Sequence, residues 1–192
     1  AASTPRWPRG WSVGAARSAC RALLGTPHDA DTSEWLCQDL CDALAPSGVV
    51  GRLYVVPFGE HQREISLAVP QGMRIIMYRR VMLQVAERIA RSRAQGSRDR
   101  RVARSGGLSD AREHRSVNEA VTMPVLRPLI GSDKQEIIAR AHEIGTYDLC
   151  CQTAPDCCTL FMPRRPETHA RMPEVLAAWE SFDHEAMVEE LV

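Results

Sequence analysis

Two strand-then-helix units account for most of the regular patterning in the sequence. Residues 51–59 (GRLYVVPFG) form an apolar run that ends at a proline and a glycine, which predicts a buried strand. Residues 73–92 carry apolar side chains on one face at helical spacing, which predicts a long helix. Residues 118–131 and 132–145 repeat this order, a strand followed by a helix. Strands that alternate with helices predict an α/β fold with a parallel sheet flanked by helices.

The helix over residues 132–145 has signals at both ends. Ser132 or Asp133 is a suitable N-cap, and Gly145 is expected to end the helix. Its apolar residues have the spacing of one helical face: Ile137, Ile138, Ala141 and Ile144.

Other elements have weaker patterns. Residues 31–44 have helical spacing, with Thr32 or Ser33 as the expected N-cap. Residues 62–69 fit either a short helix or a strand, and residues 173–192 predict a closing amphipathic helix or pair of helices.

Two segments interrupt this patterning. Residues 1–30 have no clean period, and prolines and a glycine break any early helix. Residues 91–116 are rich in arginine, contain glycines and have almost no large apolar side chains. Such a composition predicts disorder or an exposed basic loop. An unstructured interior stretch of that length is unusual in a compact domain.

Length and charge set the broad class of protein. The chain has 192 residues, which is enough for one domain with a real core, and its formal net charge is zero at pH 7. No apolar run reaches the length of a membrane span, and the start lacks the apolar core of a signal peptide. We therefore expect a cytoplasmic protein with no membrane partner, whose cysteines are seldom structural disulfides.

Four of the seven cysteines lie in two adjacent pairs, Cys150 with Cys151 and Cys157 with Cys158. Zinc sites favour spaced pairs, since adjacent side chains diverge and do not readily bind one tetrahedral ion; we therefore expect no metal site. Cys150 and Cys151 are expected to be buried as small apolar residues. The second pair follows a turn-like APD stretch and is equally compatible with burial and with a reactive thiol.

Basic residues at two helix starts are candidate anion contacts. Lys134 is the single lysine among 24 Lys and Arg residues, and it lies in the first turn of a helix, where free N–H groups attract phosphate. A solvated pair with Asp133 is the alternative. Arg79 and Arg80 begin the long helix, and one is expected at the edge of the core while the other can meet an anion.

Four stretches together resemble one family: LYVVPFGEHQREI, MYRRVMLQVAERIA, NEAVTMPVLRPLIGSDKQEIIARAHEIGTYDL and DCCTLFMPRRPETH. It is the tRNA 4-thiouridine sulfurtransferase family, also called thiamine-biosynthesis sulfurtransferases, in its C-terminal PP-loop ATP-binding domain. The resemblance covers most of residues 50–90 and nearly all of 118–192. It implies the fold of PP-loop ATP pyrophosphatases, an adenine-nucleotide alpha-hydrolase-like fold. We expect a single, incomplete domain over residues 1–192, without the family's THUMP domain.

The resemblance also implies a reaction. Enzymes of this kind use ATP and Mg²⁺ to adenylate the C4 oxygen of a uridine in tRNA and then replace that oxygen with sulfur. Sulfur comes from a separate persulfide donor such as a cysteine desulfurase, and it can also serve thiamine thiazole synthesis.

Site residues follow from motif position. Cys158 is implied as the thiol that resolves the sulfur-transfer intermediate, with Cys157 as the alternative. Lys134 and Asp133 match the pair at the phosphate end of ATP, where a lysine stabilises developing charge. Arg79 matches a position that contacts ATP.

Two family segments are missing where the patterning fails. One is the glycine-rich loop Ser-Gly-Gly-x-Asp-Ser, which holds phosphate, and the other is a Thr-Gly-Glu-Ser-Leu-Gly-Gln stretch. Permitted codons for GSRDRRVARSGGLSDAREH, read one nucleotide later, encode Ala-Leu-Val-Thr-Gly-Glu-Ser-Leu-Gly-Gln-Val-Ala-Ser-Gln-Thr-Leu-Glu-Asn. Permitted codons for AASTPRWPRGW, read two nucleotides later, encode Gly-Ile-Asp-Ser-Pro-Val-Ala-Pro-Trp-Met. We therefore expect residues 1–30 and 91–116 to be out-of-frame or disordered.

A chain translated faithfully in this form is expected to fold poorly and to adenylate nothing, because arginine-rich sequence cannot fill core positions. Two other readings stay open. One is a non-catalytic RNA-binding remnant that uses the arginine-rich residues 91–116 against phosphates. The other is a small zinc or redox protein built on the cysteine pairs.

Overall fold

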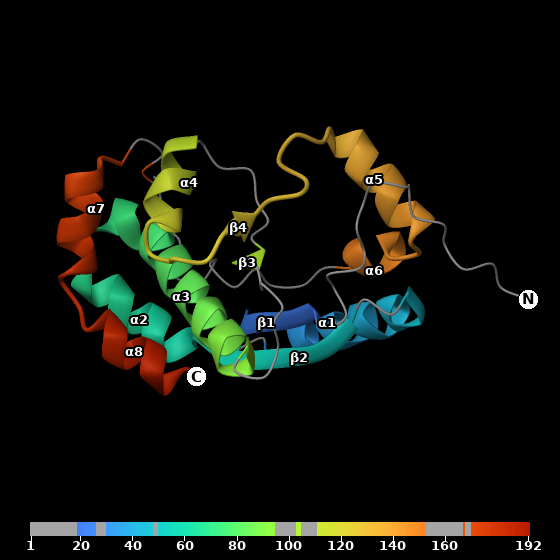
Figure 1. Ribbon diagram of the computed structural model, residues 1–192, viewed down its shortest axis with the longest axis horizontal. Coiled ribbons are helices and arrows are strands. Elements are labelled where there is room, and N and C mark those ends of the chain that lie inside the picture. The colour runs from blue at the N-terminus through green and yellow to red at the C-terminus, as the bar shows by residue number, and fades with distance from the viewer. Residues whose placement is uncertain are drawn as a thin grey trace, which may run out of the picture.

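The computed structural model describes residues 19–25, 30–47, 50–94, 103–104, 111–152, 167 and 170–192 (Figure 1). Its elements run in the order β1 (Ala19–Gly25), α1 (Ala30–Leu44), η2 (Ala45–Ser47), β2 (Val50–Pro57), α2 (Gly59–Ala68), η3 (Gln71–Met73), α3 (Arg74–Ala94), β3 (Ala103–Arg104), α4 (Ala111–Asn118), β4 (Val125–Leu126), α5 (Lys134–Glu143), α6 (Tyr147–Cys150), α7 (Met172–Trp179) and α8 (His184–Glu190).

Both pairs of strands in the described part of the chain are parallel. β1 pairs with β2, from Ala19 opposite Val50 to Gly25 opposite Pro57. β3 pairs with β4, with Arg104 opposite Leu126 at the end of the register. Along the chain, a helix connects the two strands of each pair: α1 lies in the connection from β1 to β2, and α4 in the connection from β3 to β4. The predicted α/β fold with parallel strand pairing and flanking helices is confirmed.

Helix α3 is the central element of the packing. It contacts α2, α4, α7, α8, β1 and β3, and in Figure 1 it runs diagonally between the helices at one side and the strands. Its inward face follows the helical period, with Tyr78, Val81 and Val85 almost fully buried. Tyr78 meets Phe58 edge-to-face, with ring centroids 6.3 Å apart. The long helix predicted over residues 73–92 therefore builds the core.

Several predicted elements are confirmed with small shifts of boundary. The strand predicted over residues 51–59 is β2, and residues 62–69 lie largely in helix α2. The helix predicted over residues 132–145 is α5, with Asp133 as its N-cap. Gly145 follows it with a positive φ of 72°, the left-handed conformation that favours glycine after a helix.

Other predictions differ from the structure. The strand predicted over residues 118–131 is only two residues long, at Val125–Leu126, between Pro124 and Pro128. Proline lacks the N–H that a strand ladder requires, so the two prolines restrict pairing to the residues between them.

The poorly patterned segments contain regular structure. β1 occupies residues 19–25 of the first one. In the second, α3 continues to Ala94, β3 follows, and residues 111–116 belong to α4. That residues 1–30 and 91–116 are out of frame or disordered stays a prediction; residues 1–18, 26–29, 95–102 and 105–110 lie outside the described residues.

Two further corrections concern α1 and membranes. α1 begins at Ala30, so neither Thr32 nor Ser33 is its cap. Every helix within the described ranges is too short or too polar to cross a bilayer.

Candidate functional site

The two adjacent arginines of α3 have different surroundings. The Arg80 side chain is only 2% exposed, and it donates hydrogen bonds from Nη1 to the Ser116 carbonyl (2.5 Å) and from Nη2 to Glu119 Oε2 (2.8 Å). Its guanidinium carbon also lies 4.6 Å from the centroid of the Trp179 ring. Arg79 is half-buried instead. Arg80 is therefore the core residue of the pair, and Arg79 is the one that reaches solvent.

Arg127 lies close to Arg79 and was not predicted from the sequence. It directly follows β4 and is half-buried, and its Nη2 donates to Asn118 Oδ1 at 2.8 Å. Burial lowers the pKa of Arg127, and the positive charge of Arg79 lowers that pKa further. A cation immediately after a strand in VLRPLIG was the available signal, since ligand-binding groups gather at the carboxyl ends of parallel strands.

The first turn of α5 is closed by a capping box. Asp133 Oδ1 accepts from the Gln135 N–H at 2.7 Å, and the Asp133 N–H donates to Glu136 Oε2 at 3.0 Å. Two carboxylates thus accept hydrogen bonds from N–H groups at this helix start, which were candidate phosphate contacts. Lys134 is exposed and forms no ion pair with any described residue. Its ammonium group is the part of this helix start that can reach a phosphate.

Lys134 and Arg79 are not brought into contact within the described ranges. The chain leaves β4 in a wide loop before α5 begins, as Figure 1 shows. That loop contains successive turns, in which Ile130 N–H donates to the Arg127 carbonyl at 3.2 Å and Ser132 N–H to the Leu129 carbonyl at 3.1 Å. The two predicted ATP contacts therefore belong to separate structural units, the long helix and the β4–α5 connection.

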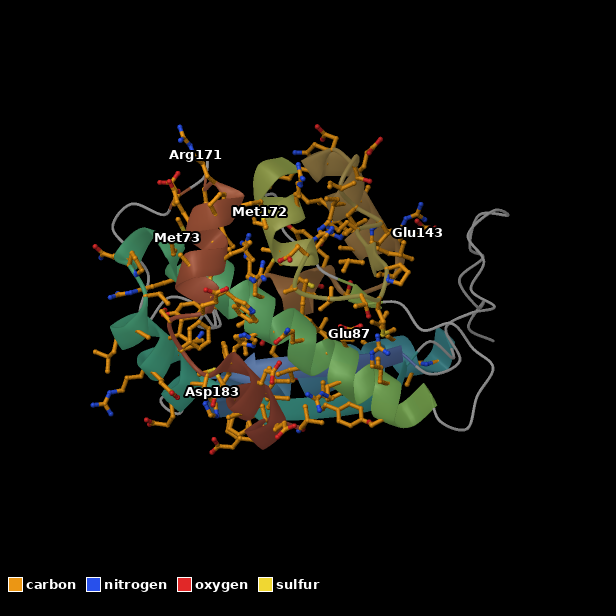
Figure 2. All side chains as sticks on the ribbon, turned by 60° about the vertical axis from the view of Figure 1, so that its left-hand side comes forward. Met73, Glu87, Glu143, Arg171, Met172 and Asp183 are labelled. Carbon is orange, nitrogen blue, oxygen red and sulfur yellow. The ribbon has the colours of Figure 1, made fainter. Side chains whose placement is uncertain are left out.

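The buried carboxylate of Glu87 holds the segment that leads into β4. Glu87 projects from α3 (Figure 2) and accepts from Thr122 Oγ1 at 2.7 Å and from the Met123 N–H at 3.0 Å. Arg91 forms an ion pair with it at 2.8 Å. Burial raises the pKa of Glu87, but the hydrogen bonds from Thr122, Arg91 and Met123 outweigh burial, so the pKa lies below its usual value. This contact fixes the approach to Arg127.

The exposure of the first cysteine pair differs from the prediction. Cys150 and Cys151 are free and exposed, so the prediction that they pack in the interior is wrong. They lie at the end of the four-residue helix α6, on the surface. The neighbouring side chain of Cys151 raises the pKa of Tyr147. Cys157 and Cys158, the predicted catalytic thiols, lie outside the described residues.

A metal centre finds no support within the described ranges. They contain no group of three or more His, Cys, Asp or Glu side chains placed to hold an ion. No residue of this part of the chain is therefore assigned to Mg²⁺.

Comparison with known proteins agrees with this arrangement of elements. The family model for the thiamine biosynthesis protein (ThiI) matches residues 19–184. A probable tRNA sulfurtransferase of Caldanaerobacter subterraneus is 37% identical over 166 residues, which is 85% of this chain and 43% of that protein. A probable tRNA sulfurtransferase of Thermus thermophilus is 46% identical over 128 residues, covering 65% of this chain and 31% of that protein.

The fold has a counterpart among solved structures. A 4-thiouridine synthetase, in a crystal structure with RNA and bound ATP, superimposes with a TM-score of 0.75 at 29% sequence identity. The match covers 91% of this chain and 46% of that one. The chain thus spans less than half the length of these relatives. Since the family model covers most of the chain at residues 19–184, the chain belongs to the thiamine biosynthesis protein (ThiI) family.

Proposed function

We propose that this chain is the nucleotide-binding part of an enzyme that uses ATP to transfer sulfur to a uridine of tRNA. The observation that carries the proposal is its likeness, over 91% of its length, to a 4-thiouridine synthetase whose structure holds both RNA and ATP. The relatives named as probable tRNA sulfurtransferases support the same activity.

The chemistry explains the need for ATP. A uracil carbonyl oxygen is a poor leaving group. Attack of the C4 oxygen on the α-phosphorus of ATP releases pyrophosphate and forms an adenylated base, from which AMP departs readily. The terminal sulfur of a persulfide then attacks C4 and displaces AMP. A second thiol cleaves the resulting disulfide, so that the sulfur stays on the base and a disulfide forms between this thiol and the cysteine that carried the persulfide.

Three side chains are proposed for these steps. Arg79 contacts ATP from α3, and Lys134 stabilises phosphate charge through its exposed ammonium group. Cys158 supplies the thiol that cleaves the disulfide, with Cys157 as the alternative. Mg²⁺ would enter with the phosphates of ATP, because Mg²⁺ in nucleotide sites is commonly held by substrate phosphates and one or two carboxylates. Asp133 acts as the helix cap in this proposal.

Disrupted reading frames are proposed as the cause of the two missing family segments. The family match begins at residue 19, after the AASTPRWPRGW stretch from which a shifted frame yields Gly-Ile-Asp-Ser. That sequence belongs to the glycine-rich loop expected to hold phosphate. Without it the chain keeps Arg79 and Lys134 but lacks the backbone N–H groups that surround a triphosphate.

The test compares the chain with a version in which both frames are restored. ATP affinity is measured first by calorimetry, and 4-thiouridine in tRNA is then measured with a cysteine desulfurase and cysteine as the sulfur source. The restored chain is expected to bind ATP, and the present chain to bind it weakly or not at all. A Cys158→Ser variant of the restored chain should still bind ATP, because its change removes only the thiol step.

The two parts of the proposal fail separately. A restored chain without ATP affinity would contradict the function. A present chain that thiolates tRNA as well as the restored one would contradict the frame disruption and leave the function standing.

A further inference from the structure

We infer that the outward face of α1 is a docking surface for an arginine-bearing segment of a partner protein, with Trp35 as its apolar anchor. The surface consists of Glu34, Trp35, Gln38, Asp39 and Asp42. It is separate from the proposed ATP and sulfur chemistry, because α1 carries none of the residues proposed for those steps.

α1 has two sides of different character. Its apolar side chains and cysteines lie on one side at helical spacing, and Cys41 on that side is buried. The helix contacts β1, β2 and α6, and Figure 1 shows it beside these elements. Positions 34, 35, 38, 39 and 42 recur at three- and four-residue intervals on the other side. That side is the outward face of the helix.

Trp35 departs from this amphipathic pattern. It is the largest apolar residue of α1, yet it lies among the polar positions and is 63% exposed. Single exposed aliphatic residues are ordinary on protein surfaces, but an exposed indole ring leaves a large apolar area in water. Tryptophan is also enriched among the few residues that dominate the energy of protein interfaces. The ring of Trp35 is therefore available to a partner.

The charge around Trp35 determines the class of partner. Asp39 and Asp42 are exposed on the same face, and Glu34 is half-buried. α1 contains no lysine, arginine or histidine, and none of these three carboxylates forms an ion pair with a described residue. The uncompensated negative charge repels phosphate and attracts cationic groups. It disfavours a nucleic acid and favours a basic protein segment.

The core of the chain contains the same combination of groups in a complete form. The guanidinium of Arg80 lies 4.6 Å from the centroid of the Trp179 ring and pairs with Glu119 at 2.8 Å. On α1 the ring and the carboxylates are present, and no described arginine lies over Trp35. An arginine of the partner can stack on the indole and donate to a carboxylate one turn away.

Gln38 adds a polar contact to this surface. Its Nε2 donates to Glu34 Oε1 at 3.2 Å, which orients the amide along the outward face. The amide oxygen is then the acceptor that faces a donor of the partner. The surface thus offers an aromatic ring, carboxylates and an amide oxygen, all of which suit the N–H groups of arginine.

The test uses the 192-residue chain and a fluorescein-labelled peptide of alternating glycine and arginine as the probe. Fluorescence anisotropy at low salt measures the peptide affinity of the unaltered chain, of Trp35→Ala and of the control Leu67→Ala. Leu67 is a matched control, because it is an apolar residue 80% exposed on another helix, α2. Loss of the anchor predicts affinity roughly tenfold or more weaker for Trp35→Ala. Leu67→Ala should match the unaltered chain.

Further variants separate the ring from the charge. Trp35→Phe keeps a smaller ring with a weaker attraction for cations, so its affinity should be intermediate. The double variant Asp39→Asn, Asp42→Asn should bind roughly two- to tenfold more weakly and depend less on salt. Thermal unfolding should be the same in all these variants, because the substituted residues are exposed. A peptide with glutamine in place of arginine should not bind.

Three results would overturn the inference. The first is unchanged peptide affinity in both Trp35 variants, or an equal loss of affinity in Leu67→Ala. The second is an RNA hairpin that binds the unaltered chain and binds Trp35→Ala more weakly, which would assign the surface to nucleic acid. The third is self-association in sedimentation experiments that Trp35→Ala abolishes, which would assign the surface to a second copy of the chain.

Discussion

The guanidinium carbon of Arg80 lies 4.6 Å from the centroid of the Trp179 ring, although 99 residues separate the two along the chain (179 − 80). The same guanidinium donates to the Ser116 carbonyl and to Glu119. One buried side chain thus connects α3, the end of α4 and α7. Because Arg80 follows Arg79, this contact also fixes the part of α3 that presents the proposed phosphate-binding residue.

Replacing Arg80 should therefore destabilise the whole chain. Arg80→Gln removes the ion pair of a buried guanidinium with the exposed Glu119, a hydrogen bond to a carbonyl and a contact with an aromatic ring, and is expected to lower the free energy of unfolding by about 3 kcal/mol. Arg88→Gln is the matched control, because Arg88 meets Glu189 at 3.8 Å on the surface and should contribute less than about 1 kcal/mol. Urea unfolding measures both. Equal losses in the two variants would contradict the central role of Arg80.

His184 makes stability depend on pH near neutrality. Its ring stacks on Trp179 at 4.0 Å, and burial lowers its pKa below the usual 6.5, with the charge of Arg80 acting in the same direction. The unfolded chain therefore binds the proton more readily than the folded one. Stability is expected to fall as the pH drops below about 6.5, until the folded histidine also becomes protonated.

Variants of two histidines check this prediction. His184→Gln should remove that part of the pH dependence, measured as the free energy of unfolding between about pH 7.5 and 5.5. His142→Gln is the control, since His142 is exposed and stacks on Tyr147 instead. A His184→Gln variant with an unaltered slope of stability against pH would contradict the assignment.

Glu87 makes the stability of the chain depend on pH in a more acidic range. Its pKa lies below the usual 4.5, so the folded chain holds the carboxylate ionised more readily than the unfolded chain. Its stabilisation is therefore fully present above about pH 4.5 and is lost as the pH falls through the lowered value. Glu87→Gln should reduce the free energy of unfolding at pH 7, and the difference from the unaltered chain should shrink at about pH 3.5.

The control for Glu87 is Glu143→Gln. Glu143 is exposed on α5 (Figure 2) and pairs, among the described residues, with Arg140, three residues away. The loss of unfolding free energy in Glu143→Gln should be small at both pH values. If Glu87→Gln cost the same amount of stability at pH 7 and at pH 3.5, the ionised carboxylate would not be the stabilising species.

The elements that could be predicted from the sequence are those with a repeating apolar pattern. β2, α3 and α5 have such patterns and formed as expected. In α3 the patterned face is buried in the core, whereas the apolar face of α5 contains no buried residue. The proximity of Arg79 and Arg127 could not be predicted in this way. It depends on how α3 packs against α4 and on where β4 ends, and neither is encoded within a short window of sequence.

Short surface elements were missed for a related reason. α6 has four residues, too few to show a period, so the surroundings of Cys150 and Cys151 could not be read from the sequence. The capping box around Asp133 was partly visible, because Asp133 and Glu136 have the required spacing. From the sequence alone, Asp133 could be either a helix cap or a phosphate contact.

Asp133 and Lys134 are expected to have different roles. Asp133 stabilises the helix, and Lys134 binds the ligand. Asp133→Ala removes the N-cap and is expected to lower the free energy of unfolding by about 1 kcal/mol. Lys134→Ala should leave stability unchanged, because Lys134 is exposed and has no ion pair among the described residues. In the frame-restored chain it should instead weaken ATP binding. Equal destabilisation by the two substitutions would contradict this division.

The exposed cysteines give a direct test of the surface near α6. Cys150 and Cys151 should react within minutes with a thiol reagent in the folded chain, whereas Cys41, which is only 9% exposed, should react after unfolding. Peptide mapping by mass spectrometry after brief alkylation assigns each modified residue. A Cys150→Ser, Cys151→Ser variant provides the control, because labelling at positions 150 and 151 should disappear while Cys41 stays protected. Protection of Cys150 and Cys151 in the folded chain would mean that they pack in the interior as small apolar residues.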